Sequence, residues 1–234
     1  MAKEKKDSGK TIVLVSGGMD SCVTAAIAAA RGGELALVHV NYGQRTEARE
    51  LASFKRLADF YAVKERLIAD VRYLAAIGGS ALTDAGIKIP TVAERTEGVQ
   101  PTYVPFRNTH LIAIAVSWAE VIGATKILIG IVEEDAAGYP DCRRSYLAAM
   151  NEVVRLGTRP ETEIEVEAPL VGMTKTEIVR RGAELGAPFE LTWSCYRQEE
   201  VPCGDCLSCE LRRKAFAEAG VEDPIRGKKV KGKK

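Results

Sequence analysis

Residues 16–21, with the sequence Ser-Gly-Gly-Met-Asp-Ser, constrain the fold of this chain more than any other segment. They follow an apolar run at residues 11–15, which predicts a buried strand, and they precede an alanine-rich helical stretch. A glycine pair lets the backbone turn tightly at such a junction. The start of the helix then presents free amide N–H groups and the positive end of a dipole, which together bind phosphate. The segment therefore predicts a phosphate-binding loop at the end of the first strand.

The side chains of this loop differ from those of the common nucleotide-binding loops. It lacks the lysine of the Gly-x-x-x-x-Gly-Lys-Ser/Thr loop, and it lacks the Gly-x-Gly-x-x-Gly dinucleotide pattern. The Asp20 carboxylate repels phosphate, so we expect it to hold Mg²⁺ or to orient neighbouring donors. A glycine turn that only joins strand to helix is the alternative. We assign nucleotide binding to Val15, Ser16, Gly17, Gly18, Met19, Asp20, Ser21 and Cys22.

Apolar strand candidates alternate with helical stretches along most of the chain. This alternation predicts an α/β fold, a parallel five-stranded doubly wound sheet with helices on both faces. Ligands bind such sheets at the carboxyl ends of the strands, which is where the serine-glycine loop lies. The predicted strands are residues 11–15, 35–40, 65–69, 126–131 and 164–167, and the predicted helices are 21–31, 47–61, 108–122, 145–156 and 174–185.

Composition limits the classes of partner. The chain has 234 residues with 33 basic and 32 acidic side chains, so it has no strong overall field for nucleic acid or membrane. Residues 1–10 are polar and lysine-rich and do not resemble a secretory signal, and no apolar run is long enough to span a bilayer. We therefore expect a cytoplasmic protein without stable nucleic-acid binding. The basic tail at residues 225–234 is interpreted as a flexible end, with a weak nucleic-acid contact as the alternative.

Four of the six cysteines crowd the C-terminal part in a Cys-x7-Cys-x2-Cys-x2-Cys pattern. Four thiolates at this spacing suit one tetrahedral Zn²⁺ with no open coordination position, which predicts a structural ion. An iron–sulfur cluster is the alternative with the same ligands. The predicted ligands are Cys195, Cys203, Cys206 and Cys209.

Two further segments carry expectations. The connection at residues 70–106 is long and punctuated by glycine and proline, so we expect part of it to cover a bound substrate; disorder is the alternative. The stretch at residues 108–122 is apolar nearly all round, which predicts a helix buried in the core or against a second subunit.

The combination of the two motifs is similar to a known family. The loop resembles the pyrophosphate loop of the ATP-pyrophosphatase class, with an adenine nucleotide α-hydrolase-like fold. Together with the late cysteine cluster it resembles the 7-cyano-7-deazaguanine synthase family of queuosine biosynthesis. Four more segments carry this resemblance in the same order along the chain: Tyr42-Gly-Gln-Arg, Val104-Pro-Phe-Arg-Asn, Gly138-Tyr-Pro-Asp-Cys-Arg and Leu191-Thr-Trp-Ser-Cys-Tyr.

The resemblance implies a ligase that converts 7-carboxy-7-deazaguanine and ammonia to the 7-cyano compound, with ATP cleaved to AMP and pyrophosphate. It implies ATP, Mg²⁺ and Zn²⁺ as cofactors and a homodimer as the assembly. We assign catalytic roles to Asp20, Ser21 and Arg107: Ser21 and Arg107 can stabilise negative charge on phosphate and carboxylate, and Asp20 can hold Mg²⁺ or orient neighbouring donors. The expected substrate-binding residues are Gln44, Arg45, Arg107, Asn108, Tyr139, Asp141 and Arg143.

Some residues depart from the pattern of the family. Phe106 stands where a small residue is common, Ala136-Ala137 replaces an aromatic-serine pair, and Asn41 replaces an aspartate. Besides a nucleotide- and zinc-binding module that is not an enzyme, two other functions stay open. One is a related ligase that adenylates another carboxylate, even one on a macromolecule. The other is tRNA thiolation, for which Cys142 or Cys22 is the candidate sulfur carrier.

The expected division of the chain is a flexible N-terminus (1–10), an α/β domain (11–190), a cysteine segment (191–224) and the tail (225–234).

Overall fold

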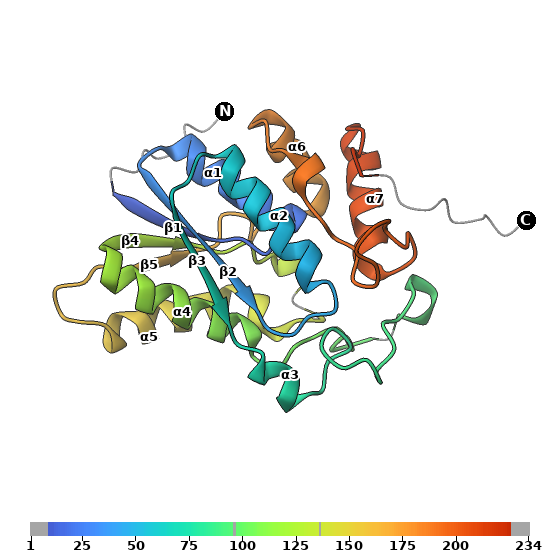
Figure 1. Ribbon diagram of the computed structural model, residues 1–234, viewed down its shortest axis with the longest axis horizontal. Coiled ribbons are helices and arrows are strands. Elements are labelled where there is room, and N and C mark those ends of the chain that lie inside the picture. Colours follow the sequence, from blue (N-terminus) through green and yellow to red (C-terminus); the bar gives the residue numbers. More distant parts are fainter. Residues whose placement is uncertain (1–8, 96, 136, 226–234) are drawn as a thin grey trace, which may run out of the picture.

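A parallel five-stranded sheet forms the centre of the computed structural model, which describes residues 9–95, 97–135 and 137–225. The strands lie in the order β3-β2-β1-β4-β5 (Figure 1). Because the chain order reverses between β1 and β4, the switch point of the sheet lies beside the end of β1. The predicted α/β fold class is confirmed. The strands are β1 Lys10–Leu14, β2 Glu34–Asn41, β3 Glu65–Asp70, β4 Ala124–Leu128 and β5 Glu165–Glu167.

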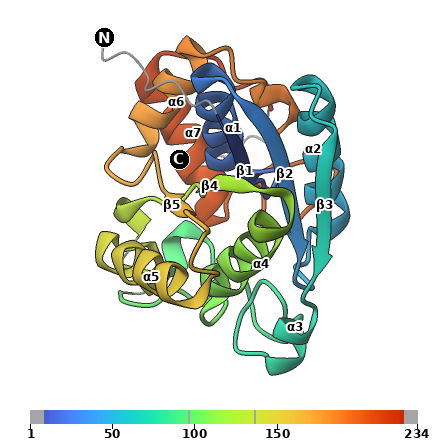
Figure 2. The same cartoon turned by 90° about the vertical axis from the view of Figure 1, so that its left-hand side faces the viewer.

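Helices cover both faces of this sheet, as the alternation predicts. α1, α2 and α6 lie on one face, α4 and α5 lie on the other, and α7 packs beside α6 (Figures 1 and 2). The helices are α1 Met19–Arg31, α2 Glu47–Phe60, α3 Tyr73–Ile77, α4 Arg107–Ile122, α5 Arg144–Gly157, α6 Lys175–Glu184 and α7 Leu207–Ala219; single 3₁₀ turns are Val92–Glu94, Glu133–Asp135, Pro140–Cys142 and Phe189–Leu191.

The side chains of β1 alternate between the two helical layers. Val13 is paired in register with Leu37 and Leu128, and all three belong to the core beneath α1 and α2. Ile12 and Leu14 belong to the core on the opposite face, beneath α4 and α5. A parallel strand that is buried on both faces has a continuous run of apolar residues in its sequence, which is why this strand could be predicted.

β4 ends earlier than predicted, at Leu128 rather than at residue 131. The reason is the close approach of Gly130 to the first turn of α1. A Cβ atom on Gly130 would lie 3.2 Å from the backbone nitrogen of Ser21 and 3.0 Å from Oγ1 of Thr24. The chain therefore leaves the sheet here and continues as residues 129–132, which border the site described below.

Two helices are missed by the sequence analysis. α3 is only five residues long and lies within the punctuated connection after β3. α7 begins directly after Cys206 and carries Cys209. The cysteine spacing therefore continues into a helix, and Cys209 alone of the four cysteines lies inside it. The expectations for residues 1–8, for Ala136 and for the basic tail from residue 226 concern residues outside the described ranges.

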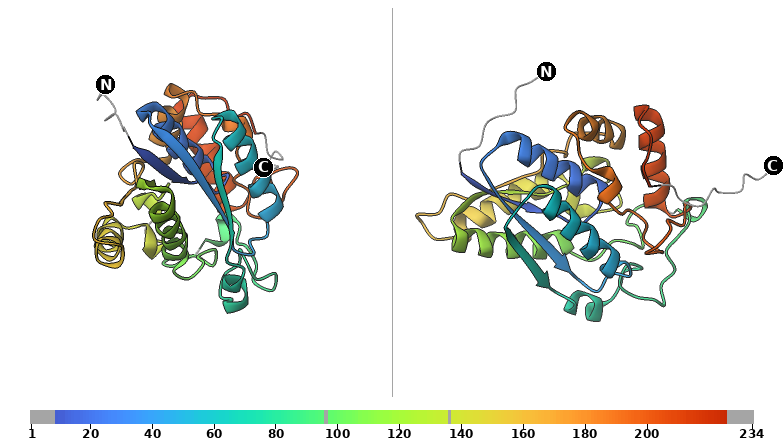
Figure 3. Two further views of the ribbon diagram at one scale, coloured as in Figure 1. Left: turned by 60° about the vertical axis from the view of Figure 1, so that its left-hand side comes forward. Right: turned by 45° about the horizontal axis from the view of Figure 1, so that its top comes forward.

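The long connection between β3 and α4 lies against the cysteine segment (Figure 3). Thr91 forms an isolated antiparallel bridge with Cys206. Arg197 joins the same two segments, because its guanidinium donates to Oδ1 of Asp205 at 2.8 Å and to the carbonyl oxygen of Ile89 at 3.0 Å. The connection is thus held beside the carboxyl ends of the strands, where it can contribute side chains to a site.

Arg212 of α7 joins separate stretches of the C-terminal part of the chain. It is buried, its guanidinium donates to both carboxylate oxygens of Asp223 at 2.8 Å, and it also donates to Oγ1 of Thr192 at 2.7 Å. These hydrogen bonds satisfy a guanidinium that burial without partners would destabilise. The expected division at residue 190 stays a prediction.

α4 buries one side and exposes another. Ile112, Ala115 and Ala119 are fully buried in the core, whereas Val121 is 78 % exposed. The expectation of a core helix is confirmed for the buried side. A contact with a second subunit stays a prediction.

Phe106, the residue before α4, has a left-handed backbone with φ of +59°, and its ring is 56 % exposed. Residues with a Cβ atom pay about 1–2 kcal/mol in this conformation, and glycine does not. We therefore expect Phe106→Gly to be about 1 kcal/mol more stable than Phe106→Ala in chemical denaturation, because both variants lose the ring and only one keeps the strain. Ala113, exposed and helical in α4, is the control: glycine there should be less stable than the native alanine by about 1 kcal/mol. Equal stability of the two Phe106 variants would contradict the prediction.

Candidate active site

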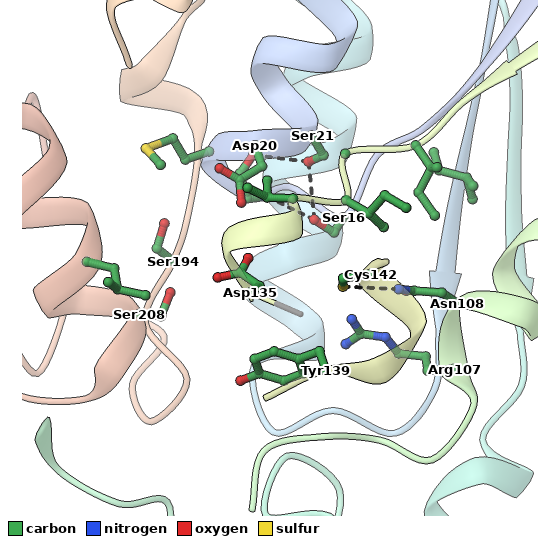
Figure 4. Close-up of a pocket in the computed structure, with 18 of the residues that line it drawn as sticks. Ser16, Asp20, Ser21, Arg107, Asn108, Asp135, Tyr139, Cys142, Ser194 and Ser208 are labelled. Carbon is green, nitrogen blue, oxygen red and sulfur yellow. Dashed lines mark hydrogen bonds between the residues drawn. The ribbon is translucent and has the colours of Figure 1, made fainter. Parts of the chain in front are cut away.

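A pocket of about 360 Å³ lies at the carboxyl ends of the strands, beside the switch point. The loop at residues 16–21 forms one wall, and Ser194 and Ser208 of the cysteine segment face it across the pocket (Figure 4). Arg95 and Gln100 come from the long connection. Segments far apart in the sequence therefore meet at one site, and the expectation that part of the long connection covers a bound substrate stays a prediction.

The loop after β1 has the compact form that phosphate binding needs. Gly17 has φ of +88°, and a Cβ atom there would lie 2.7 Å from the carbonyl oxygen of Glu50, so only glycine fits. The Ser16 and Ser21 hydroxyl oxygens lie 3.1 Å apart, and the Ser21 hydroxyl donates to the carbonyl oxygen of Gly18 at 3.0 Å. Of the eight residues assigned to nucleotide binding, Val15, Ser16, Gly18, Met19, Asp20 and Ser21 line the pocket, and Gly17 and Cys22 lie behind them.

Lys175 supplies the cation that the loop itself lacks, and the sequence analysis misses it. It is the first residue of α6, and its Nζ lies 2.8 Å from Oδ2 of Asp20 and 2.8 Å from Oδ2 of Asp135. Burial alone would lower the pKa of Lys175, but the two carboxylates outweigh burial and raise it. Burial raises the pKa of Asp135, and Lys175 opposes that shift. The ammonium group of Lys175 therefore stays charged at the pocket wall. Two of its N–H groups can face the two carboxylates, and the third can donate to a ligand.

Arg107, the first residue of α4, brings a second positive charge to the pocket. Its Nη1 donates to the Tyr42 hydroxyl at 3.1 Å, and its guanidinium lies 5.2 Å from the centre of the Tyr42 ring. Its buried Nε has no hydrogen-bond partner among the described residues. Burial would lower the pKa of Arg107, but Tyr42 and Asp141 raise it above its usual value. A buried cation with an unused donor suits an anionic ligand group.

Asn108 and Tyr139 line the pocket near Arg107 (Figure 4). Asn108 is held by the loop before α5, because its Nδ2 donates to the carbonyl oxygen of Asp141 at 3.1 Å. The Tyr139 hydroxyl lies 2.6 Å from Oγ1 of Thr102, which belongs to the long connection. Both side chains therefore line the part of the pocket in which we expect the substrate to bind.

Four other residues assigned to the substrate do not line the pocket, and three of them have visible structural partners. Gln44 is buried and donates to the Glu50 carboxylate at 3.1 Å. The Arg45 guanidinium donates to the carbonyl oxygens of Asp84 and Ile87 in the long connection. The Asp141 carboxylate accepts a hydrogen bond from the backbone nitrogen of Asn108 at 3.0 Å, which caps α4. Arg143 is an exposed residue that precedes α5.

Glu50 of α2 lines the pocket, and the sequence analysis misses it as well. Burial raises the pKa of its carboxyl group to about 7. In the sequence it is one of several charged residues on an ordinary amphipathic helix, so no local signal separates it from the solvated acids around it.

The four predicted metal ligands come together. The Sγ atoms of Cys195, Cys203, Cys206 and Cys209 all lie within 4.8 Å of one another. Four sulfurs bound at about 2.3 Å to one ion lie about 3.8 Å apart, so this cluster could hold a metal ion after a small contraction. The backbone nitrogens of Arg197 and Cys203 donate to Cys195 Sγ at 3.4 and 3.3 Å, which favours a thiolate.

The cluster of four cysteines is connected to the loop at residues 16–21 by Trp193. Its backbone nitrogen donates to the carbonyl oxygen of Gly17 at 2.8 Å, two residues before Cys195. Its indole ring is buried and lies 4.5 Å below the guanidinium of Arg49. The cluster therefore fixes a segment that touches the back of the loop.

The two remaining cysteines are buried thiols. Burial raises the pKa of Cys22 to about 12 and that of Cys142 to about 12. Both groups are therefore protonated near neutral pH, and a protonated thiol is a poor nucleophile. Cys142 lines the pocket and accepts a weak hydrogen bond from Asn108 at 3.7 Å.

None of the helices in the described part of the chain combines the length and the apolar character that crossing a membrane requires.

Comparison with known proteins gives one family. A sequence profile described as "Queuosine biosynthesis protein QueC" matches residues 10–220. The chain is 52 % identical to the 7-cyano-7-deazaguanine synthase of Chloroherpeton thalassium over 92 % of its length and 96 % of the relative's. It is 56 % identical to the protein of the same name from Chlorobium phaeobacteroides, with the same coverage of both chains.

A solved structure shares the fold. It is a 4-thiouridine synthetase–RNA complex with bound ATP, with a TM-score of 0.51 and 19 % sequence identity. The match covers 91 % of this chain and 50 % of that one. At this identity the likeness bears on the fold alone.

Proposed function

Because the chain belongs to the QueC family of queuosine biosynthesis proteins, we propose that it converts 7-carboxy-7-deazaguanine, ammonia and ATP to 7-cyano-7-deazaguanine, AMP and pyrophosphate. The names of its relatives suggest the product. The observation that carries the chemistry is one pocket that joins a phosphate-binding loop and Lys175 to the buried cation of Arg107. Such a pocket suits a triphosphate and a carboxylate side by side.

The triphosphate is proposed to lie with its two outer phosphates on the loop. Backbone N–H groups at the start of α1 and the hydroxyls of Ser16 and Ser21 face that position. Lys175 adds one positive charge, which would stabilise the charge that builds on pyrophosphate as it leaves. This places the catalytic contribution of Asp20 in the orientation of Lys175, in addition to metal binding.

The carboxylate of the substrate is proposed to bind Arg107. The free Nε donor and the positive charge suit a carboxylate oxygen, and Tyr42 holds the guanidinium in place. Asn108 and Tyr139 remain proposed substrate contacts because they line the same part of the pocket. Gln44, Arg45 and Asp141 are proposed to act indirectly, through the segments that they hold.

The proposed reaction has two activations. The carboxylate oxygen attacks the α-phosphorus of ATP, pyrophosphate leaves, and ammonia then displaces AMP to form the amide. The amide oxygen attacks a second ATP in the same way, and loss of AMP with a proton gives the nitrile. Each AMP therefore takes one oxygen of the original carboxyl group. The residues of the pocket contribute orientation and charge stabilisation, and no side chain forms a covalent bond.

Mg²⁺ fits beside the loop. Oδ1 of Asp20 is buried without a hydrogen-bond partner among the described residues, while Oδ2 is occupied by Lys175. A carboxylate oxygen of this kind is the ligand that Mg²⁺ prefers when it also binds phosphates. When bound, the ion would reduce the negative charge of the phosphates. Asp20 would hold it there.

Zn²⁺ is the proposed occupant of the cysteine cluster. Four sulfur ligands leave no open position, which is typical of a structural ion. The ion would hold Cys195 and Cys206, and through them both the segment that touches the loop and the bridge to the long connection. Reduced cysteines of this kind also suit the proposed cytoplasmic location.

We further propose a homodimer. Val121 of α4 and Val153 and Leu156 of α5 are 60–78 % exposed, and these two helices lie side by side (Figure 2). Exposed apolar side chains on adjacent helices form a surface that a second copy can cover.

The test of the proposed function is a product assay. Purified protein with Mg²⁺, ammonium, ATP and 7-carboxy-7-deazaguanine should release AMP and pyrophosphate, and the release should stop without the acid. Asp20→Ala should abolish release and leave the zinc content of the cysteine cluster unchanged, because Asp20 contacts Lys175 and is not one of the four cysteine ligands. Release of ADP, or AMP release that needs an RNA or a protein instead of the acid, would contradict the proposal.

A further inference from the structure

The Glu50 carboxylate is held rigidly at the pocket and has no part in the proposed reaction. Oγ1 of Thr46 donates to its Oε1 at 2.7 Å, and Nε2 of Gln44 donates to its Oε2 at 3.1 Å. Gln44 is itself oriented, because its Oε1 accepts a hydrogen bond from the backbone nitrogen of Tyr42 at 2.9 Å. Each carboxylate oxygen can accept a second hydrogen bond, so two acceptor sites remain side by side.

No cation in the described part of the chain forms a hydrogen bond or ion pair with this carboxylate. Its two hydrogen-bond donors are neutral, and the Arg107 charge acts on it only from a longer distance. Burial therefore dominates and raises the pKa of Glu50 to about 7, with Glu47 adding a smaller shift in the same direction. A poorly solvated carboxylate of this kind is stabilised when a ligand brings N–H donors to it.

We propose that Glu50 is a specificity-determining residue, which recognises the N1–H and 2-amino donors of a 2-amino-pyrimidinone ring. Two parallel N–H donors match the two oxygens of one carboxylate, as they do in arginine–carboxylate pairs. The inference rests on the proposed function, since it assigns one edge of the deazaguanine. In that assignment Arg107 takes the 7-carboxylate and Glu50 takes the pyrimidine edge, so that two charged groups fix the orientation of the ring. Gln44 and Thr46 are positioning residues for Glu50.

The test compares two ligands with two proteins by calorimetry, in the presence of a non-hydrolysable ATP analogue. The ligands are 7-carboxy-7-deazaguanine and the same acid without its 2-amino group. Wild-type protein should bind the acid that lacks the 2-amino group about 100-fold more weakly than the complete acid, because one Glu50 oxygen then loses its hydrogen-bond donor. Glu50→Gln should bind the complete acid about 100-fold more weakly and should distinguish the two ligands by less than about threefold, because its amide offers one acceptor and one donor.

A matched control and two further measurements make the result decisive. Glu47→Gln removes an acid from the same helix that pairs with Arg72 and does not line the pocket, so it should keep the discrimination. The ATP analogue should bind Glu50→Gln as it binds wild type, which also shows that the variant is folded. Wild-type protein that binds both acids equally, or a Glu50→Gln variant that still discriminates, would overturn the inference. If the acid supports AMP release in the same preparation, the proposed function survives that result. If the acid does not bind at all, both the inference about Glu50 and the proposed function are contradicted.

Discussion

Replacement of Lys175 with glutamine is expected to lower the rate of AMP release about 1,000-fold. Lys175 forms an ion pair with Asp20 of the loop, and its Nζ is fixed between Asp20 and Asp135 at 2.8 Å from each. A fixed charge at a departing pyrophosphate acts where negative charge increases, and loss of one such group costs about 100- to 1,000-fold. The loss should fall mainly on kcat, measured by AMP release at saturating ATP and acid.

The same substitution leaves two carboxylates without their shared cation. Asp20 and Asp135 then repel each other, so a small loss of thermal stability is also expected. Lys214→Gln is the control, because Lys214 is exposed on α7 and its ion pair among the described residues is with Glu218 of the next turn. It should leave both rate and stability within error. A folded Lys175→Gln variant with more than a tenth of the normal kcat would contradict the assigned role of Lys175.

Substitution of Cys206 with serine should have the largest effect on stability. Cys206 is fully buried, belongs to the four-sulfur cluster, caps α7 and pairs with Thr91 of the long connection. The free energy of metal binding is part of the free energy of folding in such sites. We expect loss of the bound metal and a decrease of at least about 3 kcal/mol in the free energy of unfolding. Metal analysis and urea denaturation measure the two quantities on one sample.

Activity of the Cys206→Ser variant should fall only as the fold is lost. Cys142→Ser is the matched control, because it also replaces a buried thiol but lies outside the cluster, and serine can still accept the hydrogen bond from Asn108. It should retain the metal and cost about 1 kcal/mol. A metal-free Cys206→Ser protein with unchanged stability would show that the cluster is not a structural metal site.

The sequence was sufficient for the features that depend on neighbouring residues. The loop at residues 16–21 could be predicted because strand, glycine turn and helix follow one another, and the parallel sheet could be predicted from the alternation of its elements. The cysteine ligands could be predicted because their spacing is local too. The ends of the predicted helices agree with the structure within two residues, because the apolar and polar periods that mark each helix are local as well.

The side chains that the sequence analysis misses reach the site from distant segments. Lys175 follows Asp20 by 155 positions, and only the fold brings the start of α6 beside the start of α1. One signal was present, because Lys175 stands in the first turn of a capped helix after the last strand, at the carboxyl edge of the sheet. Glu50 gave no such signal. Its place is set by Gln44 and by the approach of Gly17 to its carbonyl oxygen.

The predicted substrate arginines show a different limit of sequence-based prediction, because the sequence names candidates without showing which of them enters the pocket. Arg45 and Arg107 both lie next to the end of a strand or helix near the expected site. Because both are arginines, the sequence offered no means to tell which of them contacts a ligand. The Arg45 side chain reaches two carbonyl oxygens of the long connection, whereas the Arg107 side chain enters the pocket with an unused donor. The distinction depends on which way each side chain points, which follows from the path of residues 71–95 and 97–106 and not from the local sequence.

The fate of the carboxyl oxygens tests the central claim most directly. If the acid attacks the α-phosphorus of ATP on this loop, 7-carboxy-7-deazaguanine with ¹⁸O in both carboxyl positions must deliver one labelled oxygen to each AMP. Mass spectrometry of AMP from the complete reaction should then show a mass increase of about two units in nearly every molecule, with unlabelled pyrophosphate. Unlabelled AMP, or label found in pyrophosphate or in inorganic phosphate, would contradict the account.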